Sequence, residues 1–188
     1  QYRYYHYSDP GRATSFFHHL WAGRDLGEMG KVEVGIAKVP FGILPVASNS
    51  YFFSLAYYIG YEDDYDLGAT WQMEDGPWQV DVAYFPSDEW NGTGESVDSS
   101  RYSYDIVKTD TTHNTERHQV NLRAAYTLDH AGAGTTRLGV SGQYGRVRNV
   151  ELGRGAPRMA GAVHMKGDYG PWGVKLEAIA YDVDPLDT

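Results

Sequence analysis

The chain has no cysteine, and its 16 basic residues are outnumbered by 25 acidic ones. Without cysteine it can form neither a disulfide framework nor a thiolate metal site. The net charge of −9 argues against nucleic acid as a partner, because phosphate backbones attract basic surfaces. At 188 residues, we expect a single domain over 1–188.

Sequence motifs of enzymes and metal sites are missing as well. No H-E-x-x-H, G-x-S-x-G or phosphate-binding loop occurs, and the seven histidines lack the spacing of metal ligands. A carboxylate cluster at Glu62, Asp63, Asp64 and Asp66 offers the oxygen ligands that Ca²⁺ takes, but without EF-hand spacing. We therefore predict no enzyme activity, no cofactor and no metal site, and interpret the acidic cluster as solvated or as part of a pore mouth.

Only one stretch is free of charge for long enough to cross a bilayer as a helix, residues 39–61. It contains Pro40, Gly42, Pro45 and Gly60, and prolines and glycines at that density break helices. The stretch therefore predicts a connection rather than a transmembrane helix. The chain opens directly into strand-like sequence without a secretory signal peptide, so we expect a mature product or part of something larger.

What the chain does have is alternation of apolar and polar side chains. In residues 119–128, for example, Val120, Leu122, Ala124 and Tyr126 fall on one face, which is the period of a β-strand. By this criterion the sequence predicts about nine strands. They cover residues 2–7, 15–23, 31–38, 67–73, 79–85, 119–128, 135–147, 158–166 and 172–181.

The connections between these strands alternate between short and long. Glu74-Asp75-Gly76-Pro77 is a hairpin turn, whereas residues 39–65 and 86–117 form long loops. This rhythm predicts an all-β, antiparallel up-and-down transmembrane β-barrel, with aromatic residues near the membrane interfaces. The alternative is a soluble β-sandwich or lipocalin-like barrel with its apolar faces turned inward. Strand length favours the membrane barrel, because spanning strands need about 9–11 residues.

Charges within the strands fall on the faces opposite the apolar ones, where they would line the lumen. The predicted pore-lining residues are Lys31, Glu33, Asp81, Arg123, Arg137, His164, Lys166, Lys175 and Glu177. Basic residues outnumber acidic ones in this set, and rings of Lys and Arg favour anions in a pore. The alternative is that these are ordinary charges facing water.

The run Val34-Gly35-Ile36-Ala37-Lys38-Val39-Pro40-Phe41-Gly42 resembles the V-G-x-x-K-x-P-F-G run of the phosphate- and polyphosphate-selective porins. The acidic residues 60–68 resemble the stretch that follows in related porins. The resemblance implies a trimeric, roughly 16-stranded pore in which an extracellular loop folds into the lumen as a constriction. Residues 39–65 would be that loop, and its implied charged residues are Lys38, Glu62, Asp63, Asp64 and Asp66.

The chain departs from that family pattern in length and ending. It has about half the length of a porin of this kind, and it ends without the usual terminal aromatic. Because bacterial single-chain barrels have even strand numbers, the odd predicted count also indicates a portion of a larger porin. A complete eight- or ten-stranded barrel is the alternative.

Taken together, the sequence predicts an outer-membrane porin for passive diffusion of small hydrophilic solutes, with a preference for anions. Its expected surroundings are a lipid bilayer with lipopolysaccharide and a homotrimer. The alternative is a non-conducting barrel that acts as an adhesin, receptor or structural protein through its long loops. The apolar residues of the 39–65 loop predict that it packs inside the barrel or against a neighbouring subunit. They are Phe41, Ile43, Leu44, Phe52, Phe53 and Leu55.

Overall fold

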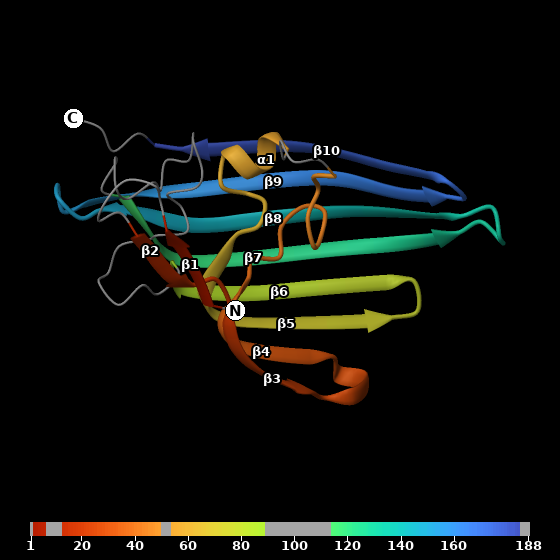
Figure 1. Cartoon of the computed structure of the whole chain (residues 1–188), viewed down its shortest axis with the longest axis horizontal. Coiled ribbons are helices and arrows are strands. Elements are labelled where there is room, and N and C mark those ends of the chain that lie inside the picture. The colour runs from red at the N-terminus through yellow and green to blue at the C-terminus, as the bar shows by residue number, and fades with distance from the viewer. Residues whose placement is uncertain (1, 7–12, 50–53, 89–113, 185–188) are drawn as a thin grey trace.

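A single eight-stranded antiparallel sheet dominates the structure, a computed structural model that describes residues 2–6, 13–49, 54–88 and 114–184 (Figure 1). Within this sheet, strands that follow one another in the chain are paired, which confirms the all-β, up-and-down prediction. No pairing joins the first strand of this sheet to the last, so the described part is consistent with a portion of a barrel wall. The strands are β3 (Leu20–Asp25), β4 (Lys31–Lys38), β5 (Tyr65–Asp75), β6 (Trp78–Ser87), β7 (Asn114–Asp129), β8 (Thr135–Asn149), β9 (Arg154–Tyr169) and β10 (Trp172–Val183).

Other regular structure is sparse. Strands β1 (Tyr2–His6) and β2 (Ala13–Phe17) pair as a separate two-stranded sheet. A 3₁₀ turn covers Gly27–Met29, and the short helix α1 covers Leu55–Tyr58. Within the described residues, no helix combines the length and the apolar character needed to cross a membrane.

The prediction of one strand over 15–23 is wrong, because two strands from different sheets, β2 and β3, share that stretch. The chain leaves the strand conformation at His18 and His19. His18 is only 2% exposed and packs on the ring of Tyr65, with ring centroids 4.2 Å apart. This contact between side chains distant in sequence interrupts the alternation, and the described residues contain ten strands instead of nine.

Strands β7, β8 and β9 are longer than predicted, at 16, 15 and 16 residues. The expected loop over 148–157 shrinks to residues 150–153, because β9 begins at Arg154 and includes Pro157 opposite Arg146. The long connection predicted over 86–117 has other ends, because β6 continues to Ser87 and β7 begins at Asn114. Residues 89–113 of that connection lie outside the described residues.

The two faces of the sheet have the reverse of the burial expected for a soluble protein. On one face, which we call the outer face, Leu122, Val163 and Leu176 are 56–60% exposed. On the other, the inner face, Asn121 and Arg123 are at most 2% exposed. Large exposed apolar side chains opposite buried polar ones are expected when lipid surrounds the sheet. The arrangement speaks against the soluble alternative.

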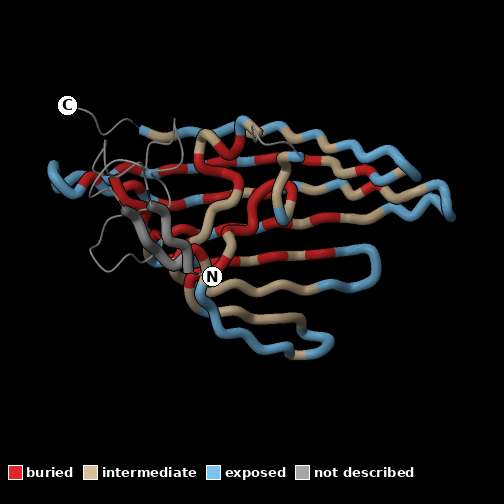
Figure 2. The backbone as a smooth tube through the Cα atoms, viewed as in Figure 1, coloured by how far each residue is buried: buried red, intermediate tan, exposed pale blue. Residues whose placement is uncertain are grey.

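The inner face is covered by the described residues of the connection between β4 and β5, 39–49 and 54–64, which we call the crossing segment (Figures 1 and 2). An apolar cluster holds this segment to the sheet. It comprises Ala37, Val39, Phe41, Ala56, Tyr61, Ala83, Phe85, Ala160 and Ala162. Burying such side chains away from water favours the covered arrangement by about 25 cal/mol per Å² of apolar surface.

The close approach of β3 to β4 depends on Gly35. Its φ is +134°, and an added Cβ would lie 2.2 Å from the Leu20 carbonyl oxygen. We expect Gly35→Ala to lower the free energy of unfolding by about 2–3 kcal/mol, because both backbone conformation and space exclude a methyl group. Urea unfolding of the full-length protein from lipid vesicles measures this. Gly142→Ala is the matched control, since its Cβ would meet nothing within 4 Å; equal losses in both variants would contradict the explanation.

Candidate pore-facing site

Arg123 is the centre of the contacts between the crossing segment and the sheet. It projects from the inner face of β7 and is 2% exposed. Its Nη1 lies 2.7 Å from Oδ2 of Asp81 on β6, and its Nε donates to the Gly42 carbonyl oxygen at 2.8 Å. The Gln79 amide also donates to the Asp81 carboxylate, at 2.8 Å. One guanidinium thus binds both a buried carboxylate and the backbone of the segment.

A second set of contacts holds the same part of the segment over β8 and β10. The Gly42 amide donates to Ser141 Oγ at 3.0 Å, and the Ile43 amide donates to Glu177 Oε1 at 3.0 Å. Lys175 Nζ donates to the Val46 carbonyl oxygen at 3.1 Å and to Asn49 Oδ1 at 2.7 Å. Backbone groups that would otherwise lose their hydrogen bonds on burial therefore find partners on the sheet.

The sequence left two places for the apolar residues of this loop, inside the barrel or against a neighbouring subunit. The position of this part of the segment on the inner face agrees with the first. Phe41, 3% exposed, belongs to the apolar cluster on the sheet, and Ile43, 5% exposed, is bound through its amide to Glu177 of β10. Leu55 does not follow the prediction, because it is 83% exposed. Phe52 and Phe53 lie outside the described residues.

Glu62 closes the crossing segment on itself. Its Oε1 accepts hydrogen bonds from the Ser48 amide at 2.8 Å and from Ser48 Oγ at 2.6 Å, and its Oε2 accepts from Ser54 Oγ. Glu62 is 6% exposed and Asp66 is 1% exposed, so the prediction of a solvated acidic cluster is wrong for these two. Their carboxylates bind internal donors because burial without partners would be costly.

Lys38 and Asp63 form a contact where the segment rejoins the sheet. Lys38 Nζ lies 3.4 Å from Asp63 Oδ1 and 4.7 Å from the centroid of the Tyr65 ring. His18 Nε2 lies 3.7 Å from the other carboxylate oxygen of Asp63. The charge of Lys38 is thus partly balanced by a carboxylate of its own segment, which weakens its attraction for a passing anion.

The carboxylates that come together in the structure are not the Glu62–Asp66 cluster considered from the sequence. Asp64 and Asp66 meet Glu116 of β7, with oxygen atoms from all three within 4.8 Å of one another. Glu116 is bound by the buried guanidinium of Arg158, and Asp66 Oδ2 accepts from the Gln119 amide at 3.1 Å. Glu116 and Asp66 therefore each have a donor on the inner face of the sheet.

Three cations form a row across the inner face toward the short turns. Arg137 on β8 stands opposite Lys166 on β9, which stands opposite Lys175 on β10. We call these three residues the basic row. Arg137 binds the Gln79 side-chain oxygen, and Lys175 binds only oxygen atoms of the segment among the described residues. Among the described residues, only Lys166 of this row forms an ion pair, 3.5 Å from the Asp168 carboxylate.

The remaining predicted pore residues also lie on the inner face. Lys31 and Glu33 pair with each other, with Lys31 Nζ 2.5 Å from the carboxylate. His164 is 6% exposed, and its Nε2 lies 3.5 Å from Nη2 of Arg123. Glu177 stands opposite His164 in register and binds the segment. The structure thus places all nine predicted residues on one face, but ties Asp81, Arg123 and Glu177 into internal contacts.

Open space remains on both sides of the crossing segment. A cavity of about 380 Å³ lies toward β4–β6 and is lined by Lys31, Lys38, Asp81 and Arg137, among others. Another, of about 420 Å³, lies toward β10 and is lined by Lys175 and Glu177 together with apolar residues of the segment. Each cavity therefore has at least one residue of the basic row on its wall.

Sequence reasoning missed several buried polar residues that organise this face. Gln143 donates to Gln119 at 2.7 Å, and Asn121 donates to Gln143 at 3.1 Å. Arg158, which binds Glu116, also places its guanidinium 4.8 Å from the centroid of the Tyr61 ring. Alternation alone is enough to place the Gln119, Asn121 and Gln143 side chains on the polar face. That this face is buried follows only from the crossing segment that covers it.

One further titratable group lies just beyond the end of β6. Burial raises the pKa of Asp88 to about 6, and the positive charge of nearby Arg117 opposes this shift. Asp88 is 7% exposed. Its carboxylate therefore changes charge in mildly acidic solution at the end of the sheet that carries the long connections.

Comparison with known proteins gives one match. A family model described as phosphate-selective porin O and P matches residues 2–166. No curated protein and no solved structure matches the chain.

Proposed function

The chain belongs to the phosphate-selective porin O and P family, and from this premise we propose that it forms part of the wall of an outer-membrane diffusion channel. The channel passes small hydrophilic solutes and prefers anions such as phosphate. The exposed apolar outer face contacts lipid, and the inner face lines the aqueous path. Membership of a porin family implies a channel rather than an enzyme.

The open sheet supports a role as part of a larger wall. In the described residues, β3 and β10 each have a neighbour on one side only. Backbone groups of such edges are not tolerated unpaired in the hydrocarbon of a bilayer, so further strands complete the barrel. Assembly into a homotrimer stays a prediction from the family resemblance.

The basic row is the observation that carries the anion preference. Arg137, Lys166 and Lys175 occupy directly opposed positions on three neighbouring strands, and only Lys166 forms an ion pair with a carboxylate of the described residues. In a narrow path with low-dielectric walls, adjacent positive charges raise the local concentration of anions. The crossing segment narrows the path beside this row and acts as the constriction.

Reconstitution of the full-length protein in a planar bilayer tests this function. We expect discrete conductance steps in KCl, a reversal potential of the anion-selective sign across a salt gradient, and inhibition of the chloride current by millimolar phosphate. Absence of conductance steps would reject the channel. Steps with a cation-selective reversal potential would reject the anion preference while leaving the channel in place.

A further inference from the structure

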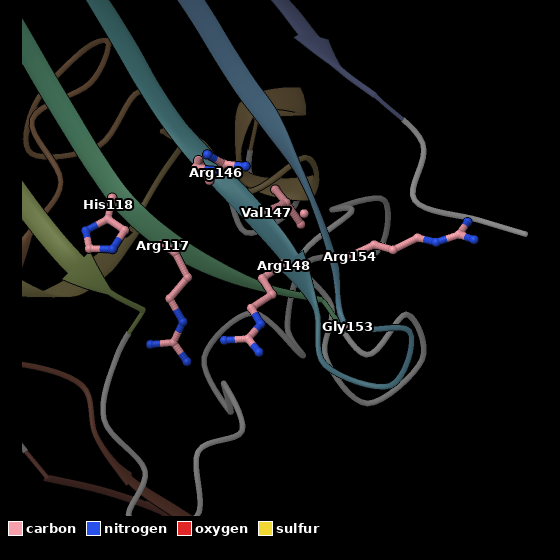
Figure 3. A pocket seen from close by; sticks show the side chains of 8 residues that line it. Arg117, His118, Arg146, Val147, Arg148, Gly153 and Arg154 are labelled. Carbon is pink, nitrogen blue, oxygen red and sulfur yellow. The ribbon is translucent and has the colours of Figure 1, made fainter.

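A second group of arginines lies on the outer face, away from the proposed path. Arg117 of β7 and Arg146 and Arg148 of β8 line a cavity of about 380 Å³ near the long connections. We call these three residues the arginine cluster. In Figure 3 the side chains of Arg117 and Arg148 extend side by side in the same direction, whereas Arg154 points away from them.

The register of the strands assigns the cluster to the outer face. Arg146 and Arg148 are exposed and flank Val147, which is fully buried on the inner face. Arg146 shares its face with Tyr144, which is 56% exposed. Arg117 stands directly opposite Arg146 in the β7–β8 pairing. The guanidinium groups therefore belong to the surface that lipid surrounds, and an ion inside the channel does not meet them.

Aromatic side chains border the cluster on the side of the apolar surface. Tyr84 Oη and His118 Nδ1 are 2.7 Å apart, and their rings stack with centroids 6.3 Å apart. His118 adopts φ 53° where the β7–β8 register shifts between Arg117 and Val120. Aromatic girdles mark the interface between hydrocarbon and headgroups. The arginines lie beyond these aromatic side chains, closer to the long connections, and are therefore at the level of the lipid headgroups.

Within the part of the chain that the structure describes, the positive charge of the cluster is little compensated. None of its three arginines forms an ion pair with a carboxylate of the described residues. Asp88 is close enough for its carboxylate to interact electrostatically with Arg117. Like-charged guanidiniums at adjacent register positions repel one another, so an anion between them would be strongly favoured.

We propose that the arginine cluster binds the phosphate groups of an anionic glycolipid of the lipopolysaccharide type in the outer leaflet. Longer loops of outer-membrane barrels are extracellular, so this end of the sheet faces that leaflet. Guanidinium groups bind phosphate oxygens in a bidentate manner, and the exposed Leu122 and Val120 below offer contact to the acyl chains. The inference rests on the outer-membrane location in the proposed function.

Titration of the full-length protein in non-ionic detergent with purified deep-rough lipopolysaccharide tests the proposal. We expect the double variant R146Q/R148Q to bind it at least about tenfold more weakly than the unchanged protein at 0.1 M salt, since each basic residue near an anionic surface contributes about 1 kcal/mol. Dephosphorylated lipopolysaccharide should bind both proteins equally weakly. Single-channel conductance of the variant should stay unchanged, because the arginines are outside the path.

Arg24→Gln is the matched control, because Arg24 is an exposed arginine at the short-turn end of the sheet. It should bind the lipopolysaccharide like the unchanged protein. Equal affinity of R146Q/R148Q and the unchanged protein would overturn the proposal, as would a lowered phosphate conductance with unaltered lipid binding. Failure of the proposed function has a different signature, the absence of conductance steps from every variant.

Discussion

Replacing Arg123 by alanine is expected to lower the free energy of unfolding by about 3–5 kcal/mol, the usual loss when one partner of a buried ion pair is removed. Of the described donors to Asp81, which is 5% exposed, the Gln79 amide alone would remain, and the Gly42 carbonyl oxygen would lose the Arg123 guanidinium. Because Arg123 also fixes the crossing segment, we expect the single-channel conductance to rise and to fluctuate more.

Urea unfolding from lipid vesicles and single-channel recording in planar bilayers give the two readouts. The variant R123M/D81L separates the roles of the guanidinium. Without a buried carboxylate to leave unpaired, its stability should largely recover, because apolar replacement of both partners is close to neutral. Its conductance should stay raised, since the bond to Gly42 is still missing.

Arg24→Ala is the control for the loss of an arginine on the outer face. It should change the free energy of unfolding by no more than about 0.5 kcal/mol and leave the single-channel conductance unchanged. If R123A leaves both the unfolding midpoint and the conductance at their original values, Arg123 does not hold the segment. A loss of stability in R123M/D81L as large as that in R123A would mean that packing, not the unpaired carboxylate, dominates.

Neutralising the basic row is expected to abolish the anion preference. In the variant R137Q/K166Q/K175Q, three positive charges are removed from one level of the inner face. A change of about one kT in the local potential alters anion and cation concentrations in opposite directions, so their permeability ratio falls by roughly sevenfold. The reversal potential across a tenfold KCl gradient measures the ratio, and phosphate should inhibit the chloride current less.

The salt dependence supplies a second check on the same variant. Screening at 1 M salt shortens the Debye length to about 3 Å, so the unchanged protein and the variant should become similar. Lys31→Gln is a control on the same face, because Lys31 already pairs with Glu33 at 2.5 Å. It should shift the reversal potential much less than the triple variant. A shift in Lys31→Gln of about one third of that in the triple variant, in proportion to the charges removed, would show that total charge, not the arrangement of the row, sets the preference.

The sequence was sufficient for the fold class and for the division of residues between two faces. Alternation with period two assigns side chains to faces regardless of tertiary context, so residues such as Arg137 and Lys166 were correctly expected on the polar one. The short turns were also readable, because Asp75-Gly76-Pro77 has the chemistry of a hairpin. The V-G-x-x-K-x-P-F-G resemblance agrees with the family that the chain belongs to.

The ends of the strands and the contact partners of individual side chains were decided only by tertiary structure. The break at His18 depends on Tyr65, which is distant in sequence, and alternation carries no information on such a contact. Likewise, Glu62 reads as a surface charge until the segment folds and brings Ser48 and Ser54 to it.

The same distinction applies to the charges of the inner face. Arg123 and Arg137 look alike in sequence, each an arginine on the polar side of a long strand. Strand pairing brings Asp81 and the crossing segment onto the first, whereas it places the second in line with Lys166 and Lys175. Local periodicity decides which way a side chain points, but the three-dimensional arrangement of distant segments decides whether its charge is neutralised or available to an ion.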